Sequence, residues 1–136
     1  MSEPEYPEMS ALIKTLAHLR QNCAWDREQT HESLAKYITE ESQELVEAIE
    51  SGDRENLLEE LGDVLYQVLF HADIAANAPS ESFDIEDVAH AVRLKMERRH
   101  PHVFGDEVAE TAEEVSANWQ KWKEAEKAAR TLPFEN

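Results

Sequence analysis

Cysteine, glycine and proline are scarce in this chain of 136 residues. The single cysteine, Cys23, cannot form an intramolecular disulfide, and 3 Gly and 5 Pro allow few tight turns, so we expect long regular elements. No apolar run reaches the ~20 residues of a membrane-spanning helix. The N-terminal sequence MSEPEYPEM also lacks the basic and apolar regions of a signal peptide. These absences predict a cytoplasmic protein with no membrane partner.

Basic residues are also few: 13 Lys and Arg stand against 30 Asp and Glu, which gives a formal net charge of −17. Such a surface repels phosphate chains, so nucleic acid is an unfavourable partner. The carboxylates would attract a hard divalent cation such as Mg²⁺, although the acidity also has the simpler use of keeping a small protein in solution. With 41% hydrophobic residues the chain is too apolar for a disordered acidic tail. We expect one domain over residues 1–136, with 1–7 and 131–136 flexible.

Hydrophobic periodicity predicts helices along the whole chain and no strand. We expect five helices, over about 8–21, 31–51, 54–77, 85–99 and 112–129. Their boundaries follow from the N-cap residues Thr30, Asp53 and Asp84, the stop residue Gly52, and a capping box of Thr111 with Glu114. The predicted fold class is all-α, a bundle built on the antiparallel pair of long helices that the short turn at 52–53 joins.

The helix predicted over 54–77 is apolar around much of its circumference. Its apolar residues are Leu57, Leu58, Leu61, Val64, Leu65, Val68, Leu69 and Phe70. A helix of this kind needs cover on several sides, which a chain this short cannot easily supply alone. We therefore expect a second copy to complete the bundle, as a homodimer or a larger homo-oligomer.

Acidic residues interrupt the apolar stripes of the two long helices. At about 100° per residue, Glu41 falls in the middle of the first stripe, Glu44 falls at its edge, and Glu40 lies well off it. On the second long helix, Glu60 and Asp63 are one turn apart among apolar residues. In an antiparallel hairpin, the acidic residues of one helix lie beside those of the other. A set of carboxylate oxygens of this kind suits Mg²⁺ or Mn²⁺. The alternative is surface acids paired with Lys or Arg.

That alternative is weakened by where the basic residues lie. No Lys or Arg follows Lys36 on the first long helix or Arg54 on the second. Instead, Lys95, Arg98 and Arg99 gather at the end of the helix predicted over 85–99. Lys95 and Arg99 share a helix face, where they either interact favourably with the helix dipole or clamp a phosphate.

A second pair with the same spacing lies further along the chain. Trp119 and Lys123 are four residues apart, so they also share a helix face. This pair would hold a base and a phosphate, or would be a core aromatic beside a solvated charge.

Together these residues resemble the MazG family of all-α nucleoside triphosphate pyrophosphohydrolases. The matching elements are EExxE at 40–44, ExxD at 60–63, WDREQTHESL at 25–34, KMERRHPHVFGD at 95–106, and Asn118-Trp119 with Lys123. The resemblance covers about residues 19–127. The family's Cys-Pro-Trp-Asp stretch reads Cys23-Ala24-Trp25-Asp26 here.

The resemblance implies a bundle completed by a second subunit and the Mg²⁺-dependent hydrolysis of an NTP or dNTP to a nucleoside monophosphate and pyrophosphate, which cleans the nucleotide pool. Glu41, Glu44, Glu60 and Asp63 would be the catalytic metal ligands, and the metal would lower the pKa of an attacking water. Glu40 would support the ligands or act as a base. The substrate-binding residues would be Lys95, Arg98, Arg99, Trp119, Lys123, Trp25, Asp26, Gln29 and His31, of which His31 also suits an ordinary helix start.

Two other functions stay open. A di-iron carboxylate bundle needs inward-facing Glu-x-x-His pairs, and the chain contains Glu28 with His31 and Glu97 with His100. Both pairs lie at predicted helix boundaries, where they cannot easily point into a core. A non-catalytic dimerisation or regulatory module that keeps the metal site is the second alternative.

Overall fold

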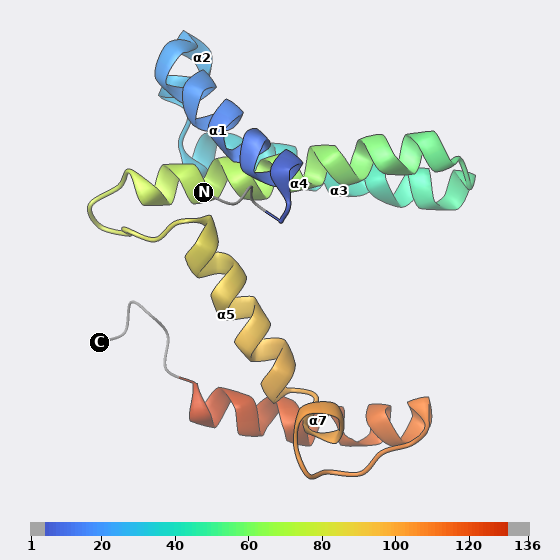
Figure 1. The fold of residues 1–136 in the computed structure, drawn as a ribbon. Helices are drawn as coiled ribbons and strands as arrows, with labels where there is room; N and C mark the ends of the chain where they lie inside the picture. Colours follow the sequence, from blue (N-terminus) through green and yellow to red (C-terminus); the bar gives the residue numbers. More distant parts are fainter. Residues whose placement is uncertain (1–4, 131–136) are drawn as a thin grey trace. The chain divides into compact units, whose positions relative to one another are not determined.

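Helices form all the regular secondary structure in the computed structural model, which describes residues 5–130 (Figure 1). They are α1 (Pro7–Asn22), α2 (Ala24–Glu28), α3 (His31–Ser51), α4 (Arg54–Ala76), α5 (Ile85–Arg98), α6 (Pro101–Phe104) and α7 (Ala112–Ala129). The predicted all-α class is confirmed. The chain divides into two compact units, which we call unit 1 (Met1–Asp84) and unit 2 (Ile85–Asn136). None of the described helices combines the length and apolar character needed to cross a membrane.

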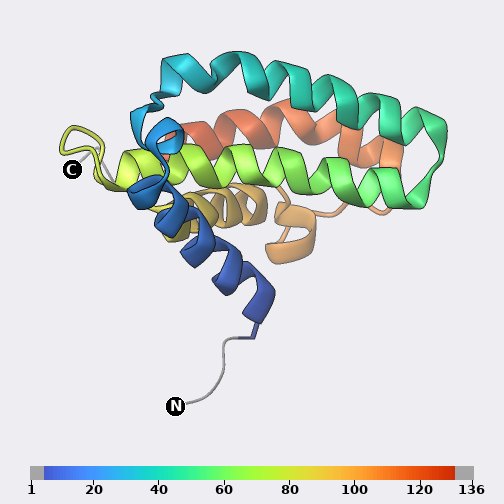
Figure 2. The ribbon, with the colours of Figure 1, turned by 90° about the horizontal axis from the view of Figure 1, so that it is seen from above.

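The α3–α4 hairpin has the boundaries that its capping residues predict. The Thr30 hydroxyl accepts a hydrogen bond from the Ser33 N–H at 3.1 Å, and Ser33 Oγ accepts one from the Thr30 N–H at 2.8 Å. Gly52 ends α3 at φ 73°, a left-handed conformation that disfavours a side chain. The Asp53 carboxylate caps α4 by accepting from two backbone N–H groups. The two helices therefore pack side by side and antiparallel (Figure 2).

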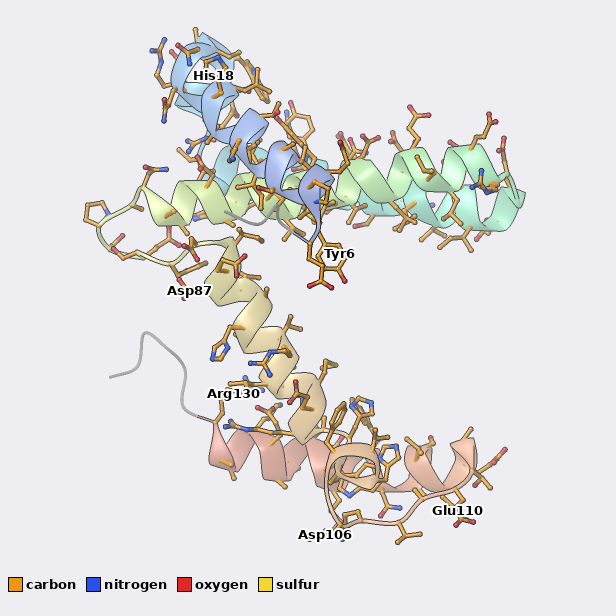
Figure 3. The ribbon with its side chains drawn as sticks, in the orientation of Figure 1. Tyr6, His18, Asp87, Asp106, Glu110 and Arg130 are labelled. Carbon is orange, nitrogen blue, oxygen red and sulfur yellow. The ribbon has the colours of Figure 1, made fainter. Side chains whose placement is uncertain are left out.

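Other details of the chain differ from the predictions. The short helices α2 and α6 were not expected from periodicity, because neither exceeds five residues. Thr111 caps α7, but the Glu114 carboxylate accepts from the Glu110 N–H rather than from the Thr111 N–H, so the predicted capping box is only half correct. Of the ends predicted to be flexible, 1–4 and 131–136 lie outside the described residues, whereas Pro7 begins α1 just after the exposed Tyr6 (Figure 3).

The core of unit 1 lies where α1 packs on α4 and α3 packs on α4. Its buried apolar residues are Leu16, Leu34, Ala48, Leu69, Phe70, Ala72 and Ala75. The long hairpin also leaves large apolar side chains uncovered: Ile49 on α3 is 60% exposed, and Leu58 on α4 is 65% exposed. The single chain as described therefore covers only part of the apolar surface that the sequence places on these two helices.

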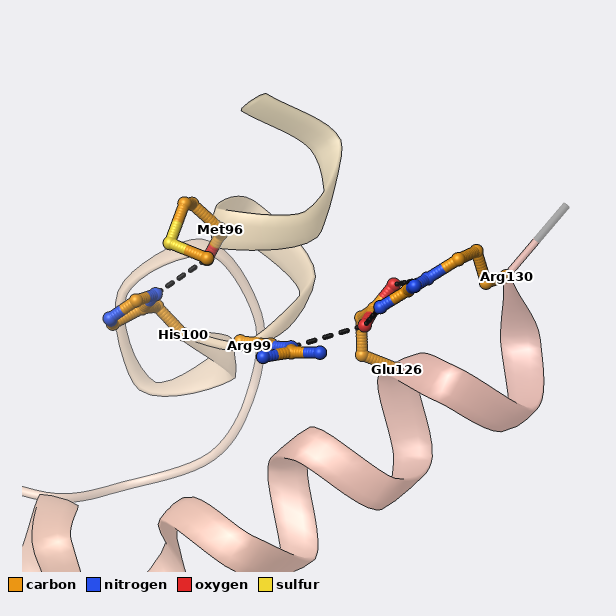
Figure 4. Close-up of polar contacts among 5 residues, drawn as sticks. All are labelled: Met96, Arg99, His100, Glu126 and Arg130. Atoms are coloured by element: carbon orange, nitrogen blue, oxygen red, sulfur yellow. Dashed lines mark hydrogen bonds and ion pairs between the residues drawn. The ribbon is translucent and has the colours of Figure 1, made fainter. Parts of the chain in front are cut away.

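Charged side chains form the buried centre of unit 2. Among its described residues only Trp122, Arg99 and Glu126 are fully buried. Arg99, directly after α5, donates from Nε to Glu126 Oε1 on α7 at 3.1 Å (Figure 4). Arg130, labelled at the end of α7 in Figure 3, donates from Nε to Glu126 Oε2 at 2.8 Å and from Nη2 to Oε1. We call Arg99, Glu126 and Arg130 the ion triad.

The ion triad makes part of the stability of unit 2 dependent on pH. The hydrogen bonds from Arg130 and Arg99 lower the pKa of Glu126 from 4.5 to about 2, although burial opposes them. A carboxylate whose pKa is lower in the folded state stabilises the fold fully above its unfolded pKa. That stabilisation is lost as the pH falls through the folded pKa. The window for this group is therefore from about pH 4.5 down to about pH 2.

Glu126→Gln should lower the free energy of unfolding by on the order of 3 kcal/mol at neutral pH, because it removes the counter-charge of the buried Arg99. The deficit relative to the unmodified chain should stay constant above about pH 5 and shrink toward pH 2. Urea unfolding followed by tryptophan fluorescence measures it. The exposed Glu124 on the same helix provides a matched control, and E124Q should change little. A deficit that does not vary with pH would contradict the assignment.

Candidate metal and phosphate site

The α3–α4 hairpin brings the four predicted metal ligands together. Glu41 and Glu44 come from α3, and Glu60 and Asp63 come from α4. One carboxylate oxygen from each residue lies within 4.8 Å of the others. The acidic pair of α3 lies beside the acidic pair of α4 because the turn at Gly52 is almost midway between them in the sequence and the two helices pack antiparallel. The fifth acid, Glu40, is exposed on α3 and is not part of this group.

The electrostatics of this acidic cluster favour a cation. Burial raises the pKa of Glu41 and of Glu60, and the neighbouring charges of Glu44 and Asp63 raise both further. One oxygen of Glu41 and one of Glu60 are buried without a hydrogen-bond partner. No Lys or Arg within residues 5–130 forms an ion pair with any of the four. Unpaired buried carboxylate oxygens are costly, and an all-oxygen set of this kind fits Mg²⁺ or Mn²⁺.

The predicted phosphate-binding residues belong to unit 2. Lys95 on α5 is half-buried, and Arg98 at the end of α5 is exposed. Arg99 is buried in the ion triad, a setting that helix periodicity did not predict because Glu126 lies 27 positions away. The acidic cluster and the basic residues are thus each assembled within a different unit. Phosphate binding by Lys95, Arg98 and Arg99 stays a prediction.

The aromatic part of unit 2 is built from α6 and α7. The half-buried Trp119 contacts the His100 ring, with 5.4 Å between the ring centroids. Trp122 is stacked on His102 at 4.8 Å, and its Nε1 donates to Glu107 Oε1 at 3.2 Å. Trp122 therefore takes the core position, which leaves Trp119 partly accessible beside the half-buried Lys123. A nucleotide contact at Trp119 and Lys123 remains a prediction.

The weaker nucleotide-binding candidates lie together around α2 and the start of α3. Trp25 is 52% exposed and meets Tyr37 edge to face, with 6.3 Å between centroids. Gln29 donates to the Trp25 carbonyl at 2.9 Å and accepts from Ser33 Oγ at 2.7 Å. Asp26 is half-buried. The surface at Trp25 is the accessible part of this group, and its contact with a nucleotide stays a prediction.

His31 has contacts that sequence reasoning missed. Its Nδ1 shares a hydrogen bond of 2.7 Å with Nδ1 of His71 on α4, and its Nε2 lies 2.8 Å from the Glu81 carboxylate. Burial, with the nearby His31, lowers the pKa of His71. Both ring nitrogens of His31 are therefore engaged inside unit 1. These partners are 40 and 50 positions away, so no local pattern could have indicated them.

A separate pocket lies between α1, α2 and the end of α4. It is lined by Ala17, Arg20, Gln21, Arg27, Asp73 and Asn77. Arg20 donates to the Asp73 carboxylate at 2.8 Å and lies over the Phe70 ring. None of the predicted site residues lines this pocket.

A metal-binding role for the acidic cluster predicts a thermal shift. At pH 7, Mg²⁺ should raise the melting temperature of the unmodified chain by several degrees, because a ligand that binds only the folded state stabilises it. Glu41→Gln should raise the melting temperature in EDTA, since it removes a repelling charge, and should abolish most of the Mg²⁺ response. Differential scanning calorimetry measures both.

The exposed Glu47 on α3 provides the control for this experiment. E47Q changes the net charge by the same amount outside the cluster and should keep the full Mg²⁺ response. Equal responses in E41Q and the unmodified chain would show that the cluster does not bind the ion.

Comparison with known proteins places this geometry in a family. The sequence profile of the MazG nucleotide pyrophosphohydrolase domain matches residues 29–104. The Escherichia coli K12 protein named nucleoside triphosphate pyrophosphohydrolase is 40% identical over 126 residues, which are 90% of this chain and 47% of that protein. The Thermotoga maritima nucleoside triphosphate pyrophosphohydrolase/pyrophosphatase MazG is 52% identical over 97 residues, 70% of this chain and 37% of that protein.

The fold has a counterpart of similar length among solved structures. The crystal structure of a mazG-related protein from Thermotoga maritima superimposes with a TM-score of 0.69 at 29% identity, covering 85% of this chain and 98% of that one. By contrast, the chain spans from 25% to 50% of the length of curated relatives that it matches. The matched segment, residues 29–104, contains all four carboxylates of the acidic cluster together with Lys95 and Arg99. The chain belongs to the MazG nucleotide pyrophosphohydrolase family.

Proposed function

We propose that this chain hydrolyses nucleoside triphosphates, NTPs or dNTPs, to a nucleoside monophosphate and pyrophosphate in a Mg²⁺-dependent reaction, and thereby removes unwanted nucleotides from the pool. The observation that carries the proposal is the acidic cluster, with four carboxylates in contact range and no cationic partner within the described residues. Relatives named as pyrophosphohydrolases support the reaction type.

The charge distribution explains why the reaction would need a cation. A triphosphate carries several negative charges, and the chain has a net charge of −17, so the two repel each other at long range. Glu41, Glu44, Glu60 and Asp63 would hold Mg²⁺, with Mn²⁺ as a substitute. When bound, the ion would neutralise phosphate oxygens and lower the pKa of a water. Glu40, next to the cluster but exposed, remains available as a base or as support for the ligands.

The remaining roles fall to cationic and aromatic side chains. Arg99 and Lys95 would bind the outgoing β- and γ-phosphates, with Arg98 beside them. Guanidinium forks match pairs of phosphate oxygens, and the lysine ammonium acts as a point charge. Trp119 and Lys123 would contact the nucleoside and a phosphate. Positive charge around the leaving pyrophosphate would favour the reaction, because negative charge builds up on the oxygen that leaves with the β-phosphate as the bond breaks.

Product analysis tests the reaction. With Mg²⁺ and a panel of NTPs and dNTPs, ³¹P NMR should detect pyrophosphate and nucleoside monophosphate in equal amounts and no orthophosphate. The panel also measures the base and sugar preference. E41Q should reduce turnover by at least about a hundredfold, equivalent to about 2.7 kcal/mol of transition-state stabilisation, while circular dichroism shows the helices unchanged.

The matched control for this assay is again E47Q, which should retain full turnover. Orthophosphate release, or unchanged turnover in E41Q, would contradict the proposed chemistry. Mg²⁺ binding without turnover of any nucleotide would favour a non-catalytic module that keeps the metal site.

We also propose that a second copy of the chain covers the exposed apolar face of the α3–α4 hairpin. Isolated exposed apolar residues are common, but this hairpin exposes several large ones on its two helices, and such a concentration of exposed apolar side chains is typical of an interaction site. They are Ile38, Val46, Ile49, Leu58, Leu61 and Val68.

Sedimentation velocity tests this assembly. The unmodified chain should sediment as a homodimer or larger oligomer, and Leu58→Glu should shift it toward the monomer, because a charge at the interface would be buried unpaired. Val108 is 79% exposed in the loop before α7, so V108E provides a control that should leave the oligomeric state unchanged. A stable monomer at micromolar concentrations of the unmodified chain would refute the assembly.

A further inference from the structure

Two side chains of the ion triad, Glu126 and Arg130, have no role in the function proposed so far. Glu126 is almost completely enclosed, with its side chain 1% exposed, and it binds Nε of Arg99 (Figure 4). We propose that Glu126 is a positioning residue for phosphate binding: it holds Arg99 by Nε so that the Nη1 and Nη2 end of the guanidinium meets the β- and γ-phosphates of a triphosphate. This inference rests on the proposed function, and it concerns contacts within unit 2 alone.

The first argument is the geometry of the guanidinium. Arginine carries five N–H donors in one plane, one on Nε and two on each terminal nitrogen. Glu126 Oε1 accepts a hydrogen bond from Arg99 Nε at 3.1 Å, and this is the side-chain hydrogen bond that Arg99 makes among the described residues. The terminal nitrogens are the pair that forms two parallel hydrogen bonds to a phosphate. A carboxylate on Nε therefore fixes the plane of the guanidinium without occupying its phosphate-binding end.

The second argument is the charge balance of the triad. A carboxylate beside a substrate-binding arginine would ordinarily cancel its charge. Here Arg130 also binds Glu126, with one donor on each carboxylate oxygen. The negative charge of Glu126 is thus divided between two guanidinium groups, so it cancels the charge of Arg99 only in part. Arg130 lets Glu126 orient Arg99 while a positive charge remains for an anion.

The third argument is preorganisation. The side chain of Arg99 is only 7% exposed, whereas the neighbouring Arg98 is exposed on α5. A free arginine loses rotamer entropy when it binds a ligand, and a side chain already fixed in place loses less. Burial also lowers the local dielectric constant, which strengthens the interaction of Arg99 with an arriving phosphate. Of the three basic residues Lys95, Arg98 and Arg99, Arg99 is therefore the one that is preorganised.

The competing explanation is that the triad only ties α7 to the end of α5. The two explanations differ in which ligands they affect. A positioning role for the β- and γ-phosphates concerns triphosphates and not monophosphates, because a monophosphate lacks both groups. If the role is purely structural, loss of Glu126 would loosen the site as a whole and weaken the binding of both ligands alike.

Calorimetric titration in Mg²⁺ separates them, using a triphosphate with a methylene bridge between the α- and β-phosphates and the corresponding monophosphate. For Glu126→Gln we expect about tenfold weaker binding of the triphosphate analogue. Losses of this size are typical when a residue that orients a metal ligand is replaced, and Glu126 would orient Arg99 in the same way. Binding of the monophosphate should be unchanged. E124Q, with the same charge change on an exposed part of α7, should bind both ligands as the unmodified chain does.

A double-mutant cycle shows whether Glu126 acts through Arg99. Arg99→Met should itself weaken binding of the triphosphate analogue. Adding E126Q to R99M should weaken this binding no further, because the guanidinium that Glu126 orients is gone. Equal weakening of both ligands by E126Q, or the same loss from E126Q in the R99M background, would overturn the proposal.

A second variant keeps the test decisive if E126Q does not fold. Arg130→Gln retains the Glu126–Arg99 contact but removes the second guanidinium that Glu126 binds, so more of the charge of Arg99 is cancelled. Triphosphate affinity should therefore fall severalfold, with monophosphate affinity unchanged. An unchanged affinity in R130Q would overturn the proposal. Failure of the unmodified chain to bind the analogue would overturn the proposed function as well, whereas normal turnover with unaltered E126Q affinity would overturn the positioning role alone.

Discussion

Four carboxylates held between two packed helices repel one another unless a cation lies among them. In this chain the repulsion follows directly from the α3–α4 hairpin, because the turn at Gly52 and Asp53 sets the register that superimposes the acidic pairs. The same hairpin provides most of the core of unit 1. The packing that stabilises the fold thus also creates an unfavourable acidic cluster, and a divalent cation is the simplest group that relieves it.

In unit 2 the neighbouring charges stabilise a buried carboxylate, whereas in unit 1 they destabilise the acidic cluster. Glu126 is more deeply buried than any carboxylate of the acidic cluster, yet its pKa is lowered to about 2, whereas the pKa values of Glu41 and Glu60 are raised. The difference is the neighbour: two guanidinium groups contact Glu126, and other carboxylates surround Glu41 and Glu60. The 13 basic residues of this acidic chain are therefore placed selectively, and their absence from α3 after Lys36 and from α4 after Arg54 is as informative as their presence around α5 and α7.

Local signals in the sequence were sufficient for the hairpin and insufficient for the ion triad. Thr30, Gly52 and Asp53 act on backbone groups within three residues, so the helix boundaries were predictable. Helical period and a short turn were enough to bring Glu41 to the level of Asp63. Arg99 and Glu126 are 27 positions apart and meet only after an intervening loop and short helix, and the contacting residues His31 and His71 of unit 1 are 40 positions apart. No periodicity connects such pairs, so the position of Arg99 in a basic cluster was predictable from the sequence and its burial was not.

The burial of the ion triad is itself an argument about function. Removing charges from water costs several kcal/mol per ion, and well-packed apolar side chains in the same place often stabilise a protein as well or better. Unit 2 nevertheless buries Arg99 and Glu126 fully, with Trp122 as its one fully buried apolar residue in the described part. Stability alone therefore does not account for an arginine at the centre of this unit. The positioning role that we propose for Glu126 would account for it, because apolar packing can support a helix but cannot bind a phosphate.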